Sequence, residues 1–342
     1  MMLMSNSQWL SPSRRDFLRW TMLAGSGLAL AGTSRLMWAA PRSRSEVFLF
    51  KTDDRIAGVR RALTWAKLGN FAGQRVIIKP NCNSHHDPPG STHISTLETV
   101  VTELKTQGAG EIVVADRSGM GDTAAVMERK GFNALSQALG FQVVALDKLP
   151  AAEWETHSLP ESHWTRGVEM PKLFRSDTIV QLCCLKTHRF GGHFTMSLKN
   201  TVGMVARYSV RDSYDYMREL HSSPWQRHMI AEINLLYRPR LVIMDAMEAF
   251  IDGGPDQGTR VEPKLILASS DRVALDAVGV AILRLMGSQD RVAQGKIFEQ
   301  DQLRRAVELN LGASSAEEIV LIAPDEASQE VAQQVEAELA KG

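Results

Sequence analysis

The sequence has few cysteines, no excess of charge of either sign and no long hydrophobic run. Three of its 342 residues are Cys, and 39 Lys and Arg balance 39 Asp and Glu. Nucleic-acid-binding proteins usually show a basic excess, so we expect no nucleic-acid partner. No apolar run reaches the ~18 residues typical of a membrane span, which argues against a multi-span membrane protein. With 44% hydrophobic residues, the chain is too apolar to be disordered.

The small number of cysteines also limits the cofactor. An iron–sulfur cluster held by four thiolates of one chain cannot be built from Cys82, Cys183 and Cys184. The sequence has no Cys-x-x-Cys pair, which excludes a zinc ribbon and a thioredoxin-like motif. Cys183 and Cys184 lie in an apolar stretch and are expected to be buried. Cys82 follows a predicted strand and could face a cleft. The identity of any cofactor stays open.

Residues 1–45 are typical of an export leader. Arg14-Arg15-Asp16-Phe17-Leu18 precedes a Gly- and Ala-rich apolar stretch over 21–32, as in twin-arginine signals. We therefore expect a periplasmic protein whose partner during export is the twin-arginine translocase. Cleavage between about residues 31 and 45 and retention as an N-terminal membrane anchor both stay open. Without the leader, 33 basic and 38 acidic residues remain, a net charge of −5.

Residues 46–342 alternate short apolar segments with helical ones, which predicts an α/β fold with a mainly parallel, doubly wound sheet and helices on both faces. We expect one large domain. The irregular stretch 150–171 marks either a boundary or an inserted lobe. Strands are predicted over 47–50, 75–79, 111–116, 141–146, 178–186, 241–244, 264–268 and 318–323. Helices are predicted over 56–70, 96–106, 122–130, 133–139, 224–237 and 272–286, with Asp271 capping the last of these, and a terminal helix follows.

Polar side chains gather where four of these strands end. Ligands of open α/β sheets bind outside the carboxyl ends of the strands. A single polar residue at a strand end is usually a cap or one half of a salt bridge, and Asp116 could cap the next helix. A cluster of lysines is more informative, because a buried ammonium needs an anionic partner. The residues expected near this edge are Lys79, Asn81, Asp116, Lys186, His188 and Asp245.

A second polar region covers residues 186–200. If Ser197 caps a helix, Lys199 and Asn200 lie in its first turn, near backbone N–H groups that attract anions. Lys199 adds to the lysines that outnumber nearby carboxylates, so we expect an anionic ligand. His188 and His193 are candidate metal ligands, and His188 is also a candidate acid or base. A His-containing surface loop is the alternative.

The motifs together resemble one family, family 362 of the domains of unknown function. The resemblance spans about residues 74–285. It implies little about activity. Some family members carry a ferredoxin-like segment with clustered Cys, which this sequence lacks, so their redox chemistry does not carry over. The matching motifs are Lys79-Pro80-Asn81, Ser91-Thr92-His93, Asp116 with Ser118, Lys186-Thr187-His188, Ser197 to Gly203, Asp245 and Gly253-Gly254-Pro255.

Two functions stay open at this point. The first is an exported enzyme acting on a small anionic substrate, with His188, Lys186 and Asp116 as candidate catalytic residues. The second is a non-catalytic cofactor- or metal-binding accessory protein of a periplasmic redox system, which the twin-arginine leader favours. In either case the candidate ligand-binding residues are Lys79, Asn81, His93, Ser118, Lys199, Asn200 and Asp245.

Overall fold

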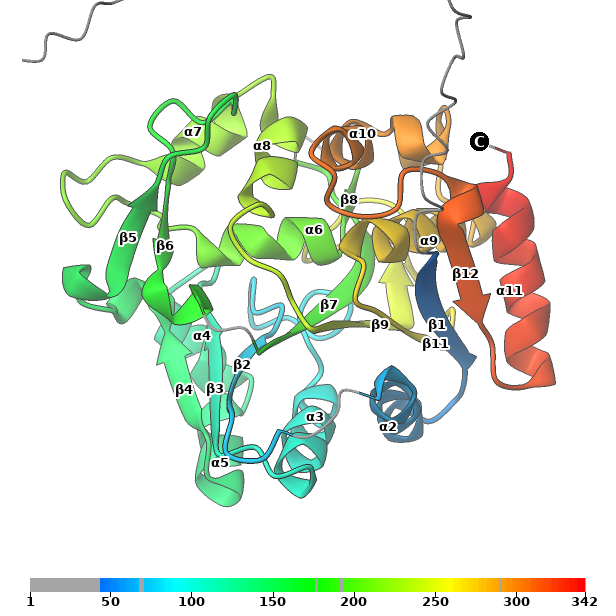
Figure 1. The fold of residues 1–342 in the computed structure, drawn as a ribbon, viewed down its shortest axis with the longest axis horizontal. Coiled ribbons are helices and arrows are strands. Elements are labelled where there is room, and N and C mark those ends of the chain that lie inside the picture. Colours follow the sequence, from blue (N-terminus) through cyan, green and yellow to red (C-terminus); the bar gives the residue numbers. More distant parts are fainter. Residues whose placement is uncertain (1–43, 68–70, 176–177, 191–192, 290, 342) are drawn as a thin grey trace, which may run out of the picture. The chain divides into compact units, whose positions relative to one another are not determined.

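The computed structural model describes residues 44–67, 71–175, 178–190, 193–289 and 291–341. A ten-stranded sheet runs through the centre of this part of the chain (Figure 1). In spatial order its main strands are β12 (Ile319–Ile322), β1 (Ser45–Lys51), β11 (Leu265–Ser269), β9 (Leu241–Phe250), β7 (Ile179–Thr187), β2 (Arg75–Lys79), β3 (Glu111–Asp116) and β4 (Gln142–Ala145). Two short strands, β10 (Arg260–Val261) and β8 (Phe194–Thr195), pair with β9 and β7.

The sheet is mixed and mostly parallel, which confirms the predicted α/β class. Strands β4, β3, β2, β7 and β9 all run in the same direction. Strand β11 runs antiparallel between β9 and β1. Every residue of β7 is buried, as expected for a strand covered on both faces.

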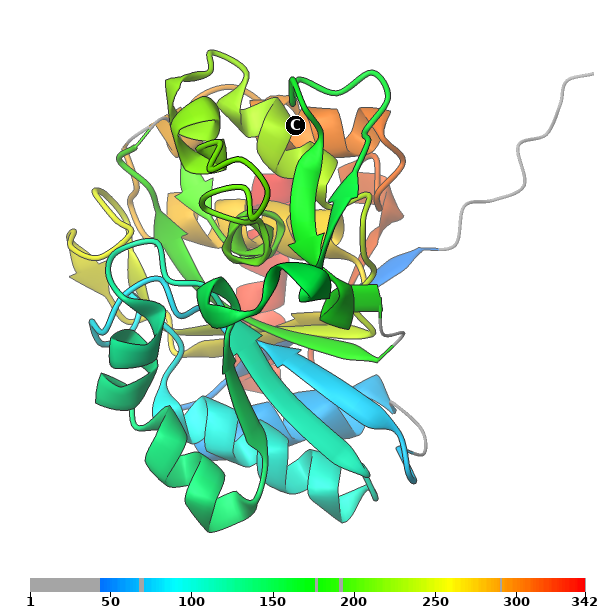
Figure 2. The same cartoon turned by 90° about the vertical axis from the view of Figure 1, so that its left-hand side faces the viewer.

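Helices cover both faces of the sheet (Figures 1 and 2). One face is covered by α2 (Arg55–Ala66), α3 (Ile94–Thr106) and α5 (Phe132–Leu139), and α4 (Thr123–Arg129) precedes α5. The other face carries α6 (Ser197–Asn200), α8 (Gln226–Ile233), α9 (Arg272–Leu285) and α11 (Glu326–Leu339), with α7 (Tyr216–Ser222) and α10 (Asp301–Glu308) further out. Short 3-10 helices are η1 (Leu146–Lys148), η2 (Ala151–Glu153), η3 (Lys172–Arg175), η4 (Thr201–Met204), η5 (Arg291–Ala293), η6 (Ile297–Glu299) and η7 (Ala316–Glu318).

Aspartate side chains begin many of these helices by accepting hydrogen bonds from backbone N–H groups of the first turn. Asp54, Asp215 and Asp325 cap α2, α7 and α11 in this way. Asp271 accepts from the N–H groups of residues 273 and 274, which confirms its predicted role at the start of α9. The cap of α4 is Asp122, so the alternative in which Asp116 caps that helix is wrong.

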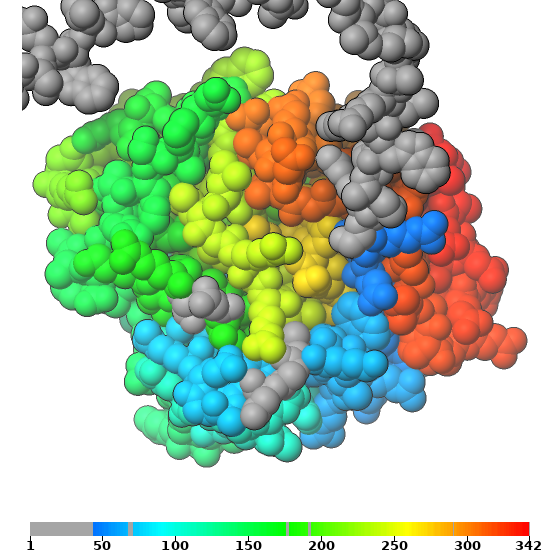
Figure 3. Space-filling view, viewed as in Figure 1, coloured from blue at the N-terminus to red at the C-terminus, as the bar shows by residue number. Residues whose placement is uncertain are grey.

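The stretch 150–171 forms a two-stranded antiparallel sheet of its own, β5 (Trp154–His157) with β6 (Val168–Pro171). It packs on one face of the main sheet, where Trp154 and Val168 share a core with Ile77 and Val113 (Figure 1). At the other end of the sheet, β1 and β12 pair in parallel, so the blue and orange-red segments lie side by side (Figure 3). Within the described ranges, no helix has both the length and the apolar character needed to cross a membrane.

The strand order reverses beside β2. The chain passes from β2 to β3 and β4 on one side, then returns to form β7 on the other side of β2. In open α/β sheets such a reversal leaves a crevice at the carboxyl ends of the two strands. Lys79 ends β2, and Lys186 is the penultimate residue of β7. The topology therefore brings these two lysines to the crevice.

Strand β9 differs from its prediction. It extends to Phe250 instead of ending at Met244, because the residues after Asp245 are again mainly apolar and pair with β11 and β7. The β7–β9 register shifts between Cys184 and Leu185, which accommodates the additional length. Asp245 therefore lies within a strand, and its predicted position at a strand end is wrong.

Candidate functional site

A polar cavity lies at the carboxyl ends of β2, β3 and β7. It encloses about 50 Å³, room for a few waters or one carboxylate or phosphate group, since one water needs about 10–15 Å³. We call it the inner cavity. It is lined by Lys79, Asn81, Asn83, Asp116, Arg117, Gly119, Lys186, His188, Thr195, Lys199, Asn200, Val202, Gly203 and Pro255. Seven of the ten candidate site residues are in this set.

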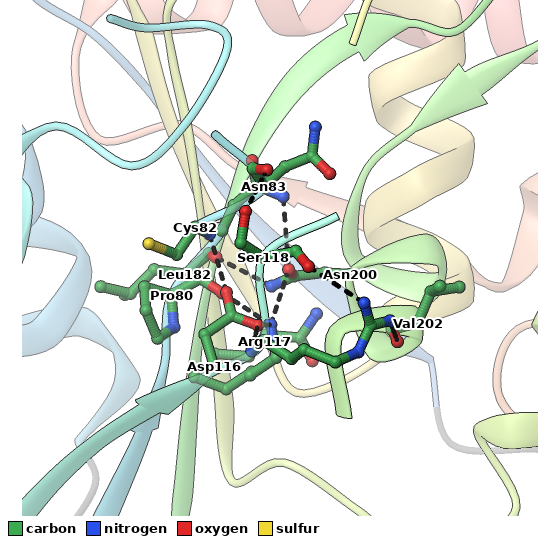
Figure 4. A network of polar contacts seen from close by, with 12 residues as sticks. Pro80, Cys82, Asn83, Asp116, Arg117, Ser118, Leu182, Asn200 and Val202 are labelled. Carbon is green, nitrogen blue, oxygen red and sulfur yellow. Dashed lines mark hydrogen bonds and ion pairs between the residues drawn. The ribbon is translucent and has the colours of Figure 1, made fainter. Parts of the chain in front are cut away.

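Lys79 and Asp116 form a buried ion pair at one wall of the inner cavity. The Lys79 ammonium lies 2.7 Å from Asp116 Oδ1 and also donates to the Pro80 carbonyl and to Asn200 Oδ1. Asp116 Oδ2 accepts from the backbone N–H of Cys82 (Figure 4). Burial lowers the pKa of Lys79 and raises that of Asp116, and each charge opposes the shift of the other. Lys79 thus has its counter-ion within the protein.

Close backbone packing holds this pair in position. A Cβ at Gly203 would lie 2.3 Å from Asp116 Oδ1 and 3.0 Å from Lys79 Nζ. Only glycine leaves room for the two charged groups at that point of η4. The Gly203 carbonyl also accepts from the backbone N–H of Arg117, which ties η4 to the end of β3.

Lys186 is buried and has no counter-ion among the described residues. Its ammonium donates to Asn81 Oδ1 at 3.1 Å and to the Gly90 carbonyl at 2.6 Å. Both acceptors are uncharged, and burial lowers the pKa of Lys186 to about 8. Two hydrogen bonds leave the third proton of the ammonium for a ligand.

Lys199 enters the cavity from α6 and is only partly buried. Within the described part of the chain its ammonium has neither a hydrogen-bond nor an ion-pair partner. Burial and the charges of Arg227 and Lys186 lower the pKa of Lys199 to about 7. Asp276 of α9 fixes α6 by accepting from Ser197 N, Ser197 Oγ and Leu198 N at 2.5–3.0 Å.

His188 is buried beside these lysines and is held in one tautomer. Its Nδ1 lies 2.9 Å from the Phe190 carbonyl, which only accepts, so Nδ1 carries the proton. Burial and the nearby charges of Lys199 and Arg227 lower the pKa of His188 well below its usual value. The neutral ring therefore has a lone pair on Nε2, as a general base requires.

Sequence reasoning missed Arg117, which lines the same cavity. Its guanidinium donates to the carbonyls of Ser118, Val202 and Val205, and Figure 4 shows the first two of these contacts. None of the carboxylates described in the structure lies within ion-pair distance of it. Its position was the signal that could have revealed it. Arg117 directly follows Asp116, which was selected because it lies at a predicted strand end.

Two buried polar atoms of the cavity lining have no partner in the described part of the chain. Asn83 Nδ2 and Thr195 Oγ1 make no hydrogen bond among the described residues. An unpaired buried polar group costs about 1–3 kcal/mol. A ligand oxygen within the inner cavity is one way to satisfy both, since an amide N–H and a hydroxyl each donate to oxygen.

The other three candidates lie outside the inner cavity. Asp245 is in the middle of β9 and accepts hydrogen bonds from Arg55 and Thr96, so it joins β9 to α2 and α3. His93 is the N-cap of α3 and accepts from Ser95 N. Ser118 Oγ donates to the Asn83 carbonyl.

Nothing in the described structure supports a metal site. His193 Nδ1 contacts Gln300 Oε1 at 2.7 Å, whereas His188 is held by a backbone carbonyl. The described residues contain no group of three or more His, Cys, Asp or Glu side chains placed to hold a metal ion. Cys82 is fully buried in the apolar core, so its expected position at a cleft is wrong. Cys183 and Cys184 are buried, as predicted.

A second, larger hollow adjoins the inner cavity. This outer cavity measures about 370 Å³ and shares Asn83, Arg117, Gly119, His188, Lys199, Val202 and Pro255 with the inner one. The remaining lining residues are mixed in character: Met120, Phe190, Arg207, Asp215, Met217, Arg218 and His221. A ligand whose anionic group fills the inner cavity can therefore extend past His188 and Lys199.

The fold and this cavity define a mostly parallel α/β protein with a cationic pocket at its strand-order reversal. A family profile described as Domain of unknown function (DUF362) matches residues 76–281. The chain belongs to this family, as the resemblance indicated. No curated protein and no solved structure matches the chain.

Proposed function

We propose that the inner cavity binds a small oxyanion, a carboxylate or phosphate group, and that the protein catalyses proton transfer on the molecule that carries it. One observation supports this most strongly: Lys186, Lys199 and Arg117 converge on the cavity with no carboxylate in ion-pair distance of any of them among the described residues. Cations that are buried, as Lys186 and Arg117 are, or partly buried, as Lys199 is, are costly unless an anion accompanies them.

The surrounding groups suit an oxyanion. Lys186 and Lys199 supply charge, and Asn83 and Thr195 supply the two unpaired donors. The Lys79–Asp116 pair is neutral as a whole, so it shapes the wall without cancelling the positive charge. With a net charge of −5 outside the leader, the protein attracts an anion only through such a local cluster.

His188 is the proposed base. Its Nε2 bears a lone pair, and the residue lines both cavities. A bound acid held by Lys186 would therefore present its neighbouring carbon to a neutral imidazole. Asp116 is not proposed as a catalytic group, because all three of its contacts, with Lys79, Cys82 and Arg117, are internal.

Isothermal titration of the full chain with sulfate and oxalate tests the anion site. We expect binding that weakens about tenfold or more in Lys186→Met, since a hydrogen bond to a charged group is worth about 1.5–3 kcal/mol. Lys296→Met, at an exposed lysine, is the matched control and should bind like the wild type. Equal affinity in both variants contradicts the proposal. Anion binding without turnover of any acid supports the accessory-protein alternative.

We also propose that residues 1–45 direct export through the twin-arginine translocase to the periplasm. The support is the leader sequence itself, because residues 1–43 lie outside the described residues. Replacing Arg14 and Arg15 together by Lys should retain the protein in the cytoplasm, whereas Arg35→Lys should leave export unchanged. Cell fractionation measures both outcomes. The intact mass of the exported protein distinguishes a cleaved leader from a retained anchor.

A further inference from the structure

Lys199 occupies the junction of the two cavities with an unengaged amine. It lines both hollows. The described residues offer it no hydrogen-bond or ion-pair partner, unlike Lys79, which has three contacts, and Lys186, which has two. Its helix, by contrast, is fixed firmly through Asp276. The structure therefore holds the backbone of Lys199 and leaves its amine available.

The neighbours of Lys199 favour the neutral form of its amine. Burial is the main cause, and the charges of Arg227 and Lys186 add to it, so the pKa of Lys199 falls to about 7. Lysines that form imines with carbonyl substrates are activated in this way, by desolvation and by a second cation nearby.

We propose that the ligand of the inner cavity is a small carboxylic acid that also bears an aldehyde or ketone group, and that Lys199 condenses with this group. The proposal rests on the anion site proposed above. The neutral amine adds to the carbonyl carbon, and loss of one water gives a C=N bond between Nζ and the ligand. Protonation of the nitrogen makes an iminium.

The remaining groups fit the chemistry that follows. Lys186 lies within the inner cavity, where it would hold the carboxylate. His188 Nε2 can take a proton from the carbon next to the iminium, so that the electron pair of the broken C–H bond moves to nitrogen and forms an enamine. The imidazolium returns the proton to close the cycle. The rest of the ligand extends into the outer cavity beside Phe190 and Met217.

Reductive trapping tests the imine. The full-length protein is incubated with glyoxylate or pyruvate and sodium cyanoborohydride, then digested and analysed by peptide mass mapping. We expect an adduct on Lys199 whose added mass is that of the acid less one oxygen. Its yield should rise with pH through about 7, well below the range of an ordinary lysine amine. Lys199→Met should lose the adduct, and Lys296→Met should keep it.

Glycolate and lactate test the anion site without the imine. They have the same carboxylate as glyoxylate and pyruvate but no aldehyde or ketone group. An unmodified Lys199 in a protein that still binds glycolate overturns the imine and leaves the anion site standing. A protein that binds neither set of acids overturns both. Because Lys199→Met could disturb α6, its far-ultraviolet circular dichroism is compared with the wild type. The position of the adduct in the unmutated chain shows whether Lys199 forms the imine, without reference to any variant.

Discussion

The Lys79 ammonium and the Asp116 carboxylate are 2.7 Å apart, and their side chains are 0% and 2% exposed. They join the ends of two neighbouring parallel strands, β2 and β3. The sequence suggested Lys79 as an anion-binding residue, yet its charge is already matched within the protein. The pair therefore forms part of the cavity wall. The lysine charges available to a ligand are those of Lys186 and Lys199, which have no counter-ion among the described residues.

Removing one member of this pair should destabilise the fold strongly. Asp116→Asn leaves Lys79 buried without a counter-charge, so we expect a loss of about 3–5 kcal/mol in the free energy of unfolding. The double variant Lys79→Met with Asp116→Asn should recover part of this loss. Urea denaturation of the four proteins in this cycle measures the coupling. Additive effects of the two single changes would show that the pair contributes nothing as a pair.

Gly203 and Gly119 make a matched test of the packing around the cavity. An added Cβ at Gly203 meets Asp116 Oδ1, which is held by three internal contacts, so Gly203→Ala should cost about 1–3 kcal/mol of stability. At Gly119 the Cβ meets Asn83 Oδ1 at 2.3 Å, the end of a side chain that can turn. Gly119→Ala should therefore change the melting temperature little and weaken sulfate binding. The reverse order of stabilities would contradict this account.

Asp276 should act as a positioning residue for α6. Asp276→Ala removes the acceptor of three hydrogen bonds at the start of that helix, and each unsatisfied buried donor costs about 1–3 kcal/mol. Stability and sulfate affinity should both fall, because Lys199 and Asn200 follow directly. Asp276→Asn keeps one oxygen and should restore part of both. An Asp276→Ala variant that loses stability but binds sulfate normally would show that the position of α6 does not affect anion binding.

Sulfate affinity should fall as pH rises from about 6 to 9. The pKa values of Lys199 and Lys186 are lowered to about 7 and about 8, so both ammonium charges are present below that window and are lost above it. Sulfate keeps its charge throughout, so the change reports the protein. In Lys199→Met the decline should begin about one pH unit higher. Titration calorimetry at constant ionic strength measures the profile, and a flat profile contradicts it.

Much of the fold could be predicted from the sequence because its strands are short and apolar throughout. The bounds of β2 and β3 were predicted residue for residue. The gathering of Lys79, Asp116 and Lys186 followed from one rule, that parallel strands end at the same edge of a sheet. To apply that rule, it is enough to know that the strands are parallel; their order in the sheet is not needed.

The rest depends on information that no local pattern contains. Asp245 was misplaced because a single acidic residue inside an apolar strand looks like the end of that strand. The ion pair of Lys79 with Asp116 depends on β2 and β3 being neighbours, which the sequence does not state. Arg117 was overlooked because two of its three carbonyl acceptors, Val202 and Val205, come from a segment far away in the chain.

The central position of β7 has a consequence for how the cavity comes into being. Ile77 of β2 pairs with Ile179 on one side of β7, and Val180 pairs with Leu241 of β9 on the other side. Pairings between residues this far apart in the sequence form slowly, because the chain loses the entropy of closing a long loop before the strand contacts stabilise it. A growing chain on the ribosome that ends before β9 has Lys186 and Lys199 but lacks the strand that pairs with β7 and Pro255 of the cavity lining. Any molecule that binds there stabilises only the finished fold.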